Sequence, residues 1–279
     1  MQLKSAVVDY LKCLQGAGVR RITLSNATLE SVRDWARAGE KSKALSPARL
    51  PEEKTIRSSV AQEAPLNLES AQKLEALQKL AARIHGDGKY RGMFRYAKQM
   101  VFGVGSHDAQ ILFVGEAPGA DEDEQGEPFV GRAGQLLTRM IQAMGLERRD
   151  VYIANIVKYR PDMPQGGSGN RKPTPSEIEA GLPYVQEQIR IIQPKVLVAL
   201  GATAVEGLFG AAKAEISKKR GQWLEFMGIP LMPTYHPAYL LRNPSNAEKR
   251  KVWEDLMLVM EKTGLPVSEK QRRFFSNKD

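Results

Sequence analysis

Short apolar runs alternate with helical patterns between residues 70 and 262, and this alternation limits the fold more than any other feature of the chain. Residues 111–114, 151–157, 196–200 and 229–234 are apolar runs with the length of a buried strand. Strands joined through helices run parallel, and such a sheet needs helices on both faces. We therefore predict an α/β fold, a three-layer sandwich with a central four-stranded, mainly parallel sheet flanked by helices.

Apolar residues at helical spacing predict the helices between these strands. One amphipathic helix should start at Ser70. Another should open with a capping box, in which Thr174 and Glu177 bond each other's backbone, and with Pro175 at its first position. Pro183 lies inside that second pattern and should kink or split the helix, because proline has no N–H for the helical ladder.

Differences in composition divide the chain into three segments. Residues 1–69 are predicted to form an N-terminal helical extension and a linker rich in Ser, Pro, Lys and Glu. Residues 70–262 hold the alternation of strands and helices and form the main domain. Residues 263–279 form a basic C-terminal tail, which we expect to be disordered from Ser268 to Asp279.

Charge and cysteine content narrow the class of protein. The formal net charge of +9 suits a polyanionic partner such as nucleic acid or an anionic membrane surface. No apolar run approaches the ~20 residues of a membrane span, and the N-terminus lacks a signal-peptide pattern, so we expect a cytoplasmic location. We also expect a monomer. The one cysteine, Cys13, excludes a disulfide within the chain, a thiolate zinc site and an iron–sulfur cluster.

The loop after the first predicted strand is rich in glycine and carboxylates. Residues 115–134 read GEAPGADEDEQGEPFVGRAG, at the end of a parallel strand where ligands bind. The carboxylates could form a solvated loop that binds a cation. The end of the loop opens a helix, where free N–H groups of Gly131 and Arg132 could instead meet a phosphate.

Two further loops carry polar residues directly after a strand. Asn155 suits reading the edge of a base, although a lone Asn more often bonds local backbone groups. His236 follows the fourth strand and could donate to a developing anion. In the sequence HPAYLLR, Leu240, Leu241 and Arg242 could form a wedge that enters stacked bases and meets a phosphate, or the leucines could fold onto the core.

These three loops together resemble the family-4 uracil-DNA glycosylases. The shared features are GEAPG…ED…PFVGRAG, the Asn after the second strand and HPAYLLR after the fourth, in order from about residue 101 to residue 260. The resemblance implies a monofunctional DNA-repair enzyme that flips uracil out of DNA and hydrolyses its N-glycosidic bond. Its partner would be DNA containing uracil, and residues 70–262 would be the glycosylase domain.

The resemblance also implies a role for each matching residue. Phe129 would stack on uracil, and Asn155 would read its polar edge. His236 would hydrogen-bond the uracil oxygen as negative charge builds, and Glu116 would orient water and stabilise the cationic sugar, with Glu122 and Asp123 as alternative carboxylates. Pocket lining and DNA contacts would come from Gly115, Ala117, Gly131, Arg132, Leu240, Leu241 and Arg242.

The chain departs from this family at the four cysteines that hold an iron–sulfur cluster. Residues 85–100 contain none, Tyr159 stands at the position expected after Lys158, and the helix near residues 181–182 lacks the fourth. We predict no cofactor and no metal. Packing of aromatic residues would replace the cluster, and the residues concerned are Phe94, Tyr96, Tyr159 and Tyr184.

Two other functions stay open from the sequence. The protein could be a glycosylase for another deaminated base, such as hypoxanthine or xanthine, or a catalytically silent relative that binds DNA lesions. The resemblance extends to related glycosylases that trap themselves covalently on DNA and carry a basic insertion with a histidine at residues 160–175. This loop has Arg171 and Lys172 but no histidine, so the resemblance implies turnover rather than covalent capture. A nucleotide-binding α/β protein is less favoured, because the chain has neither a Walker A nor a GxGxxG pattern.

Overall fold

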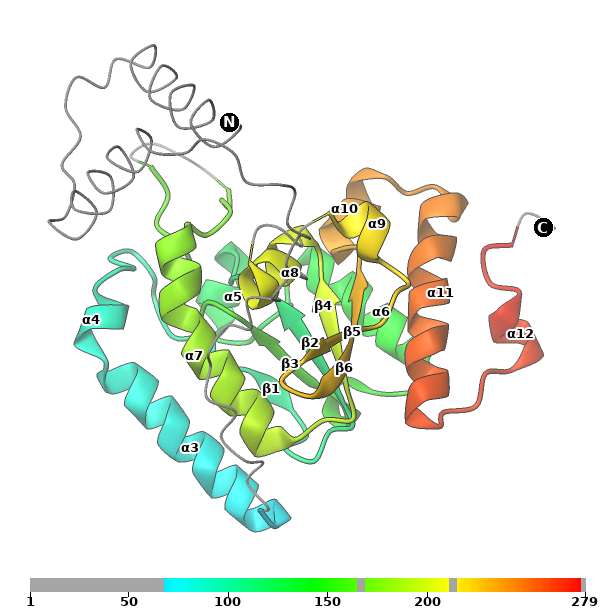
Figure 1. The fold of residues 1–279 in the computed structure, drawn as a ribbon. Coiled ribbons are helices and arrows are strands. Elements are labelled where there is room, and N and C mark those ends of the chain that lie inside the picture. Colours follow the sequence, from blue (N-terminus) through cyan, green and yellow to red (C-terminus); the bar gives the residue numbers. More distant parts are fainter. Residues whose placement is uncertain (1–67, 165–168, 211–214, 277–279) are drawn as a thin grey trace, which may run out of the picture. The chain divides into compact units, whose positions relative to one another are not determined.

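The computed structural model describes residues 68–164, 169–210 and 215–276, all within the unit that spans Ala61–Asp279 (Figure 1). The expected N-terminal extension and linker fall outside the described residues as far as residue 67. The boundary at residue 69 therefore stays a prediction. From residue 70 onwards the described chain alternates strands with helices, as the sequence pattern predicts.

Six strands form one mixed sheet in the order β1-β3-β2-β4-β6-β5. The four central strands pair in parallel, and they are β2 (Ile111–Gly115), β3 (Tyr152–Asn155), β4 (Val196–Leu200) and β6 (Ile229–Thr234). The two edge strands, β1 (Val104–Gly105) and β5 (Leu224–Phe226), run antiparallel to their neighbours. The α/β class and the parallel centre are confirmed, whereas the predicted count of four strands misses both edges.

Helices cover both faces of the sheet, which makes the three layers seen in Figure 1. One face packs against α3 (Ser70–Gly86), α7 (Pro175–Ile192) and α8 (Ala202–Phe209), and the other against α6 (Arg132–Ala143) and α11 (Asn246–Thr263). Successive strand residues point to opposite faces, so Leu197 joins the first core and Val198 the second. Strands β2, β3 and β4 are buried along their whole length, which explains their unbroken apolar runs.

Short helices occupy the loops around the sheet. They are α4 (Gly88–Arg91), α5 (Ala120–Gln125), the 3-10 helix η1 (Arg148–Asp150), α9 (Ile216–Lys219), α10 (Pro237–Arg242) and α12 (Glu269–Arg272). Two of them lie in loops that follow central strands: α5 in the loop after β2, and α10 in the loop after β6. Within the described ranges, no helix is both long and apolar enough to cross a lipid bilayer.

Helix α7 begins as the capping box predicts. Thr174 Oγ1 accepts from Glu177 N at 3.3 Å, and Glu177 Oε2 accepts from Thr174 N at 2.7 Å. The helix is not split at Pro183, contrary to one of the two expectations for that residue. Pro183 and Glu179, one turn earlier, are both exposed, so water can bond the carbonyl group that the proline leaves unpaired.

The C-terminal segment is ordered as far as residue 276, so the expectation of a disordered tail is wrong there. Trp253 Nε1 donates to Gln271 O at 2.6 Å, and Gln271 Nε2 donates to Ala143 O at 2.8 Å. The ring of Phe274 lies 5.3 Å from that of Trp253. Aromatic packing and these two hydrogen bonds hold the segment against α11 and α6, despite its basic charge.

Candidate active site

The carboxyl ends of the central strands meet at one edge of the sheet. Gly115 of β2 is in register with Asn155 of β3, and Leu200 of β4 with Thr234 of β6. His236 follows β6 by two residues. A pocket of about 500 Å³ opens at this edge, where parallel sheets bind ligands. The predicted site residues that line it are Glu116, Ala117, Glu122, Phe129, Asn155, His236 and Arg242.

The side chain of Asn155 presents an unpaired acceptor at the pocket. The residue is 2% exposed, and its Oδ1 atom has no hydrogen-bond partner. A buried polar atom left unpaired costs ~1–3 kcal/mol, so a ligand that donates to Oδ1 recovers a missing bond. Gly115 leaves the space for this arrangement, because a Cβ there would lie 2.3 Å from Asn155 Oδ1 and 2.5 Å from Phe129 Cζ.

Phe129 has a left-handed backbone, which residues other than glycine rarely adopt. Its φ is 55°, and contacts with Arg148 and Gly134 accompany this strained conformation. Arg148 donates to Phe129 O at 3.2 Å and to Pro128 O at 2.8 Å, and a Cβ at Gly134 would lie 1.8 Å from Phe129 O. The buried ring lies 5.6 Å from that of His236, at an interplanar angle of 31°. It gives the pocket an aromatic wall.

Glu122 anchors backbone groups with both carboxylate oxygens. Oε1 accepts from Val130 N at 2.9 Å and from Gly131 N at 3.0 Å, and Oε2 accepts from Gly119 N at 3.0 Å. These bonds tie the start of α5 to the segment before α6. The N–H group of Gly131 is thus already bonded, so the expectation that it is free for a phosphate is wrong. Arg132, at the first position of α6, is exposed, and its DNA contact stays a prediction.

Replacing Glu122 with glutamine is expected to lower the free energy of unfolding by ~1–3 kcal/mol, because the amide keeps only one acceptor oxygen for three N–H groups. Urea unfolding of wild type and variant measures the loss. Glu124→Gln is the matched control, since Glu124 is exposed and its carboxylate pairs with Lys98 across the surface. Equal losses in the two variants would show that Glu122 is no anchor.

The other two carboxylates of this loop differ in position. Glu116 directly follows β2 and lines the pocket, and its backbone oxygen accepts from Val157 N at 3.0 Å. No group in the part of the chain that the structure describes donates to its carboxylate. Asp123 is 1% exposed and bonds Lys98 N at 2.9 Å, away from the pocket lining. The geometry therefore favours Glu116 over Glu122 and Asp123 as the reactive carboxylate.

His236 caps α10 and presents a neutral ring to the pocket. Its Nδ1 accepts from Ala238 N at 3.1 Å, so the proton of the neutral ring resides on Nε2. Burial lowers the pKa of His236 below its ordinary value, Glu116 opposes this shift, and Arg242 strengthens it. At neutral pH the imidazole is therefore an uncharged N–H donor.

The predicted wedge is divided between core and surface. Leu240 is 4% exposed and packs in the core under α6 and α11, so the expected exposure of this leucine is wrong. Leu241 is half-buried, and the exposed Arg242 lines the pocket. Neighbouring residues of a helix point ~100° apart, so α10 turns one leucine inward and leaves the other near the surface. DNA contacts of Leu241 and Arg242 stay predictions.

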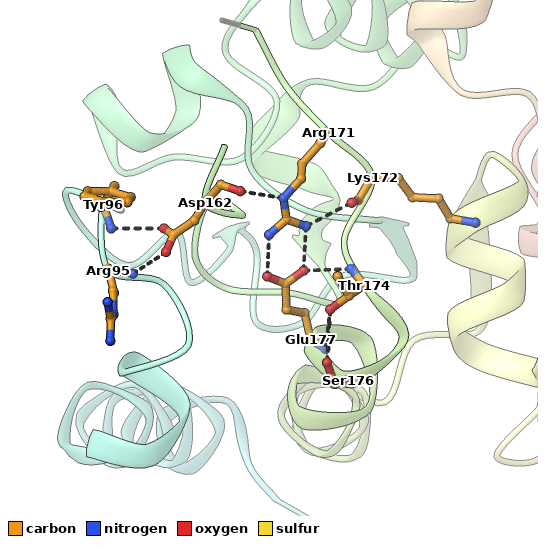
Figure 2. Close-up of polar contacts among 8 residues, drawn as sticks. All are labelled: Arg95, Tyr96, Asp162, Arg171, Lys172, Thr174, Ser176 and Glu177. Atoms are coloured by element: carbon orange, nitrogen blue, oxygen red, sulfur yellow. Dashed lines mark hydrogen bonds and ion pairs between the residues drawn. The ribbon is translucent and has the colours of Figure 1, made fainter. Parts of the chain in front are cut away.

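A further wall of the pocket comes from the loop after β3, whose basic residues were noted in the sequence but were not predicted to line the pocket. Asn170, Arg171 and Lys172, in the loop after β3, line the pocket. Asn170 Oδ1 accepts from Ala120 N at 3.1 Å, which joins the loop to α5. Figure 2 shows Arg171 bound to both carboxylate oxygens of Glu177, at 2.6 Å and 2.8 Å. This fork fixes the loop to the start of α7.

The same network reaches a third segment of the chain. Arg171 Nε donates to Asp162 O, and the Asp162 carboxylate accepts from the backbone N–H groups of Arg95 and Tyr96 (Figure 2). Burial acts to raise the pKa of Glu177, but the hydrogen bonds from Arg171 and Thr174 N outweigh it and lower that pKa. Only the folded chain brings these three segments together, so their spacing in sequence gives no signal.

Aromatic residues gather where the family resemblance places cysteines. Phe94 stacks on Tyr159 at 5.6 Å, and Tyr90 lies 5.3 Å from Phe94 and 5.0 Å from Tyr184. The predicted member Tyr96 is 71% exposed, so its inclusion is wrong, and Tyr90 takes the central place. These rings do not fit an iron–sulfur cluster, which needs thiolate ligands. Among the described residues, no group of three or more His, Cys, Asp or Glu could hold a metal ion.

Comparison with known proteins identifies the family. A model of the uracil DNA glycosylase superfamily matches residues 102–257. A type-4 uracil-DNA glycosylase of Thermotoga maritima is 48% identical over 158 residues, which cover 56% of this chain and 79% of that protein. The corresponding enzyme of Sulfurisphaera tokodaii is 40% identical over 190 residues, covering 65% and 82%. The matched region holds the parallel sheet and the pocket, and the chain therefore belongs to the uracil DNA glycosylase superfamily, among its type-4 relatives.

Proposed function

We propose that this protein is a DNA-repair glycosylase that hydrolyses the N-glycosidic bond of uracil in DNA. The observation that carries the proposal is the unpaired Asn155 Oδ1 in a pocket beside the ring of Phe129. Uracil presents an N–H donor between two carbonyl acceptors, which complements the oxygen and NH2 of an amide. Cytosine has the opposite pattern and would need the amide to turn over. The names of the type-4 relatives support the same substrate.

The nucleotide has to leave the base stack before it reaches the pocket, at a cost of a few kcal/mol. Leu241 and Arg242, at the end of α10, would offset this cost by filling the space in the stack and by meeting a phosphate. The net charge of +9 supports DNA as the partner. The monomeric state and the cytoplasmic location stay predictions from the sequence.

The reaction then follows the charges that develop as the bond breaks. When the C1′–N1 bond lengthens, its electron pair moves to the base and the sugar becomes oxocarbenium-like. The Nε2–H of His236 donates to the uracil oxygen on which negative charge builds. Glu116 orients the water that adds to C1′ and stabilises the cationic sugar. Because water adds to C1′, no bond between protein and sugar is formed. The added water loses a proton, and the uracil anion gains one.

Release of uracil from a labelled single-stranded oligonucleotide tests this function. We expect an abasic product from the uracil strand and none from strands with cytosine or thymine at the same position. Strands with hypoxanthine or xanthine test for a glycosylase of another deaminated base. Binding of the uracil strand without release of any base would refute the proposal in favour of a silent lesion-binding relative.

Replacing Glu116 with glutamine is expected to lower kcat for uracil release by at least ~10²-fold, because an uncharged amide neither stabilises the sugar cation nor takes a proton from water. The substitution keeps size and shape, so the pocket should remain intact. Glu124→Gln, outside the pocket, serves as the control and should keep the wild-type kcat. Wild-type kcat in Glu116→Gln would remove this carboxylate from the chemistry.

We also propose that the enzyme works without an iron–sulfur cluster. The whole sequence has one cysteine, and the rings of Tyr90, Phe94, Tyr159 and Tyr184 fill the region where the family's ligands are expected. Iron analysis and the visible absorption spectrum of the purified protein test this. Stoichiometric iron with the absorption of a cluster would overturn it.

A further inference from the structure

The buried side chain of Lys158 has no part in the reaction described above. The residue is 0% exposed, although lysine is almost never fully buried without a partner charge. Its Nζ donates to Asn155 O at 2.7 Å, to Phe102 O at 3.3 Å and to Gln188 Oε1. No carboxylate forms an ion pair with it among the residues that the structure describes.

The three acceptors around Nζ explain how an unpaired lysine is kept in the core. An ammonium group has three N–H donors, which matches the three oxygens, whereas a neutral amine has two. Burial lowers the pKa of Lys158 to about 7, so the group titrates near neutral pH. The phenols of Tyr90 and Tyr152 belong to the same hydrogen-bond network, and burial raises the pKa of both, which keeps them uncharged.

The contacts of Lys158 centre on the end of β3, where Asn155 enters the pocket. Lys158 N donates to Tyr90 OH at 2.8 Å. Gln188 of α7 is itself held, because its Nε2 donates to Phe102 O at 3.0 Å and to Tyr152 OH at 3.2 Å. The ammonium group is therefore fixed in direction and fastens the carbonyl group of Asn155 to α7 and to the segment before β1.

We propose that Lys158 is a positioning residue, which holds the backbone of Asn155 so that its amide faces the base in the pocket. The inference rests on the proposed function, because it assigns Asn155 to base reading. Lys158 itself touches neither base nor sugar, since it is absent from the residues that line the pocket. A shift of about 1 Å in a positioned group can cost ~10²-fold in rate, which is the scale of effect to expect.

A double-mutant cycle tests the inference on the full-length protein. Lys158→Met keeps the length of the side chain and removes its donors. We expect kcat for uracil release to fall at least ~10-fold, with KM for the oligonucleotide changed less than ~threefold, because the DNA contacts on α10 are untouched. In an Asn155→Ala background the same change should lower kcat by less than ~threefold, since the group being positioned is gone.

Two further variants separate positioning from loss of stability. Val259→Ala removes a buried side chain of α11 in the core on the other face of the sheet and serves as a destabilised control, whose kcat should stay within ~twofold of wild type at a temperature where it is folded. Gln188→Leu removes one acceptor of Nζ and should lower kcat less than Lys158→Met, with the loss again absent in Asn155→Ala. It also provides the test if Lys158→Met does not fold.

Additive losses in the cycle, or a kcat in Lys158→Met no lower than in Val259→Ala, would overturn the inference. A wild-type protein that releases no uracil would instead overturn the proposed function. The two failures are thus distinguished by the wild-type measurement alone.

Discussion

Replacing His236 with alanine is expected to lower kcat for uracil release by ~10²–10³-fold, which corresponds to ~3–4 kcal/mol of lost transition-state stabilisation. The proton of the neutral ring is on Nε2, because Nδ1 accepts from Ala238 N, so the ring can donate to the anion that forms on the base. The ring is half-buried in the pocket wall, so this donor is already in place before the charge develops. Single-turnover kinetics with a uracil oligonucleotide measures the effect.

The pH dependence of kcat provides a second test of the role of His236. Since burial lowers the pKa of His236 below 6.5, the ring stays neutral down to that lowered value. Below it, a proton on Nδ1 would face the N–H of Ala238 and break the cap of α10. We therefore expect the acid limb that His236 contributes to the kcat profile to lie below pH 6.5 and the profile to change in His236→Gln, whose amide is a neutral donor that does not titrate. A kcat within threefold of wild type in His236→Ala would exclude the residue from catalysis.

Replacing Phe94 with alanine is expected to lower the free energy of unfolding by ~3–5 kcal/mol. The ring is 0% exposed and contacts those of Tyr90 and Tyr159, so its removal leaves a cavity beside these two rings. Urea unfolding of the two proteins measures the loss. It would show how far aromatic packing supports the segment that carries Asn155.

Tyr96→Ala is the matched control for that experiment. Tyr96 lies two residues from Phe94 but is 71% exposed, so its loss should change the free energy of unfolding by no more than ~0.5 kcal/mol. Its backbone N–H to Asp162 is kept in the variant. Losses of similar size in the two variants would contradict a structural role for the aromatic cluster.

The central strands could be predicted because a strand buried on both faces is apolar at every position. This pattern is visible in the local sequence, without knowledge of the neighbouring strand. Strand β4 is buried at each of its five residues, and a short unbroken apolar run of that length is typical of a buried strand. The edge strands β1 and β5 have two and three residues, half exposed, and their pairing depends on a neighbour that the local sequence does not contain. Their absence from the prediction therefore has a physical cause.

The pocket residues were predicted as a set, with Glu116 preferred as the reactive carboxylate and Glu122 as an alternative. Only the fold shows that three backbone N–H groups occupy Glu122. Leu240 and Leu241 are likewise identical in type, and the rotation along α10 decides which one is buried. The sequence did not predict the ion pair between Arg171 and Glu177, because only the folded loop brings the two side chains together.

What the sequence by itself determined is the α/β class, the parallel centre of the sheet and the three loops that carry the pocket. These follow from apolar periodicity and from the rule that the carboxyl ends of parallel strands meet at one edge. The tertiary structure alone decided the division of carboxylates, the burial of Leu240 and the enclosure of Lys158 beneath Asn155. Each of these depends on which groups a side chain meets across the fold, and contacts between distant segments leave no local pattern.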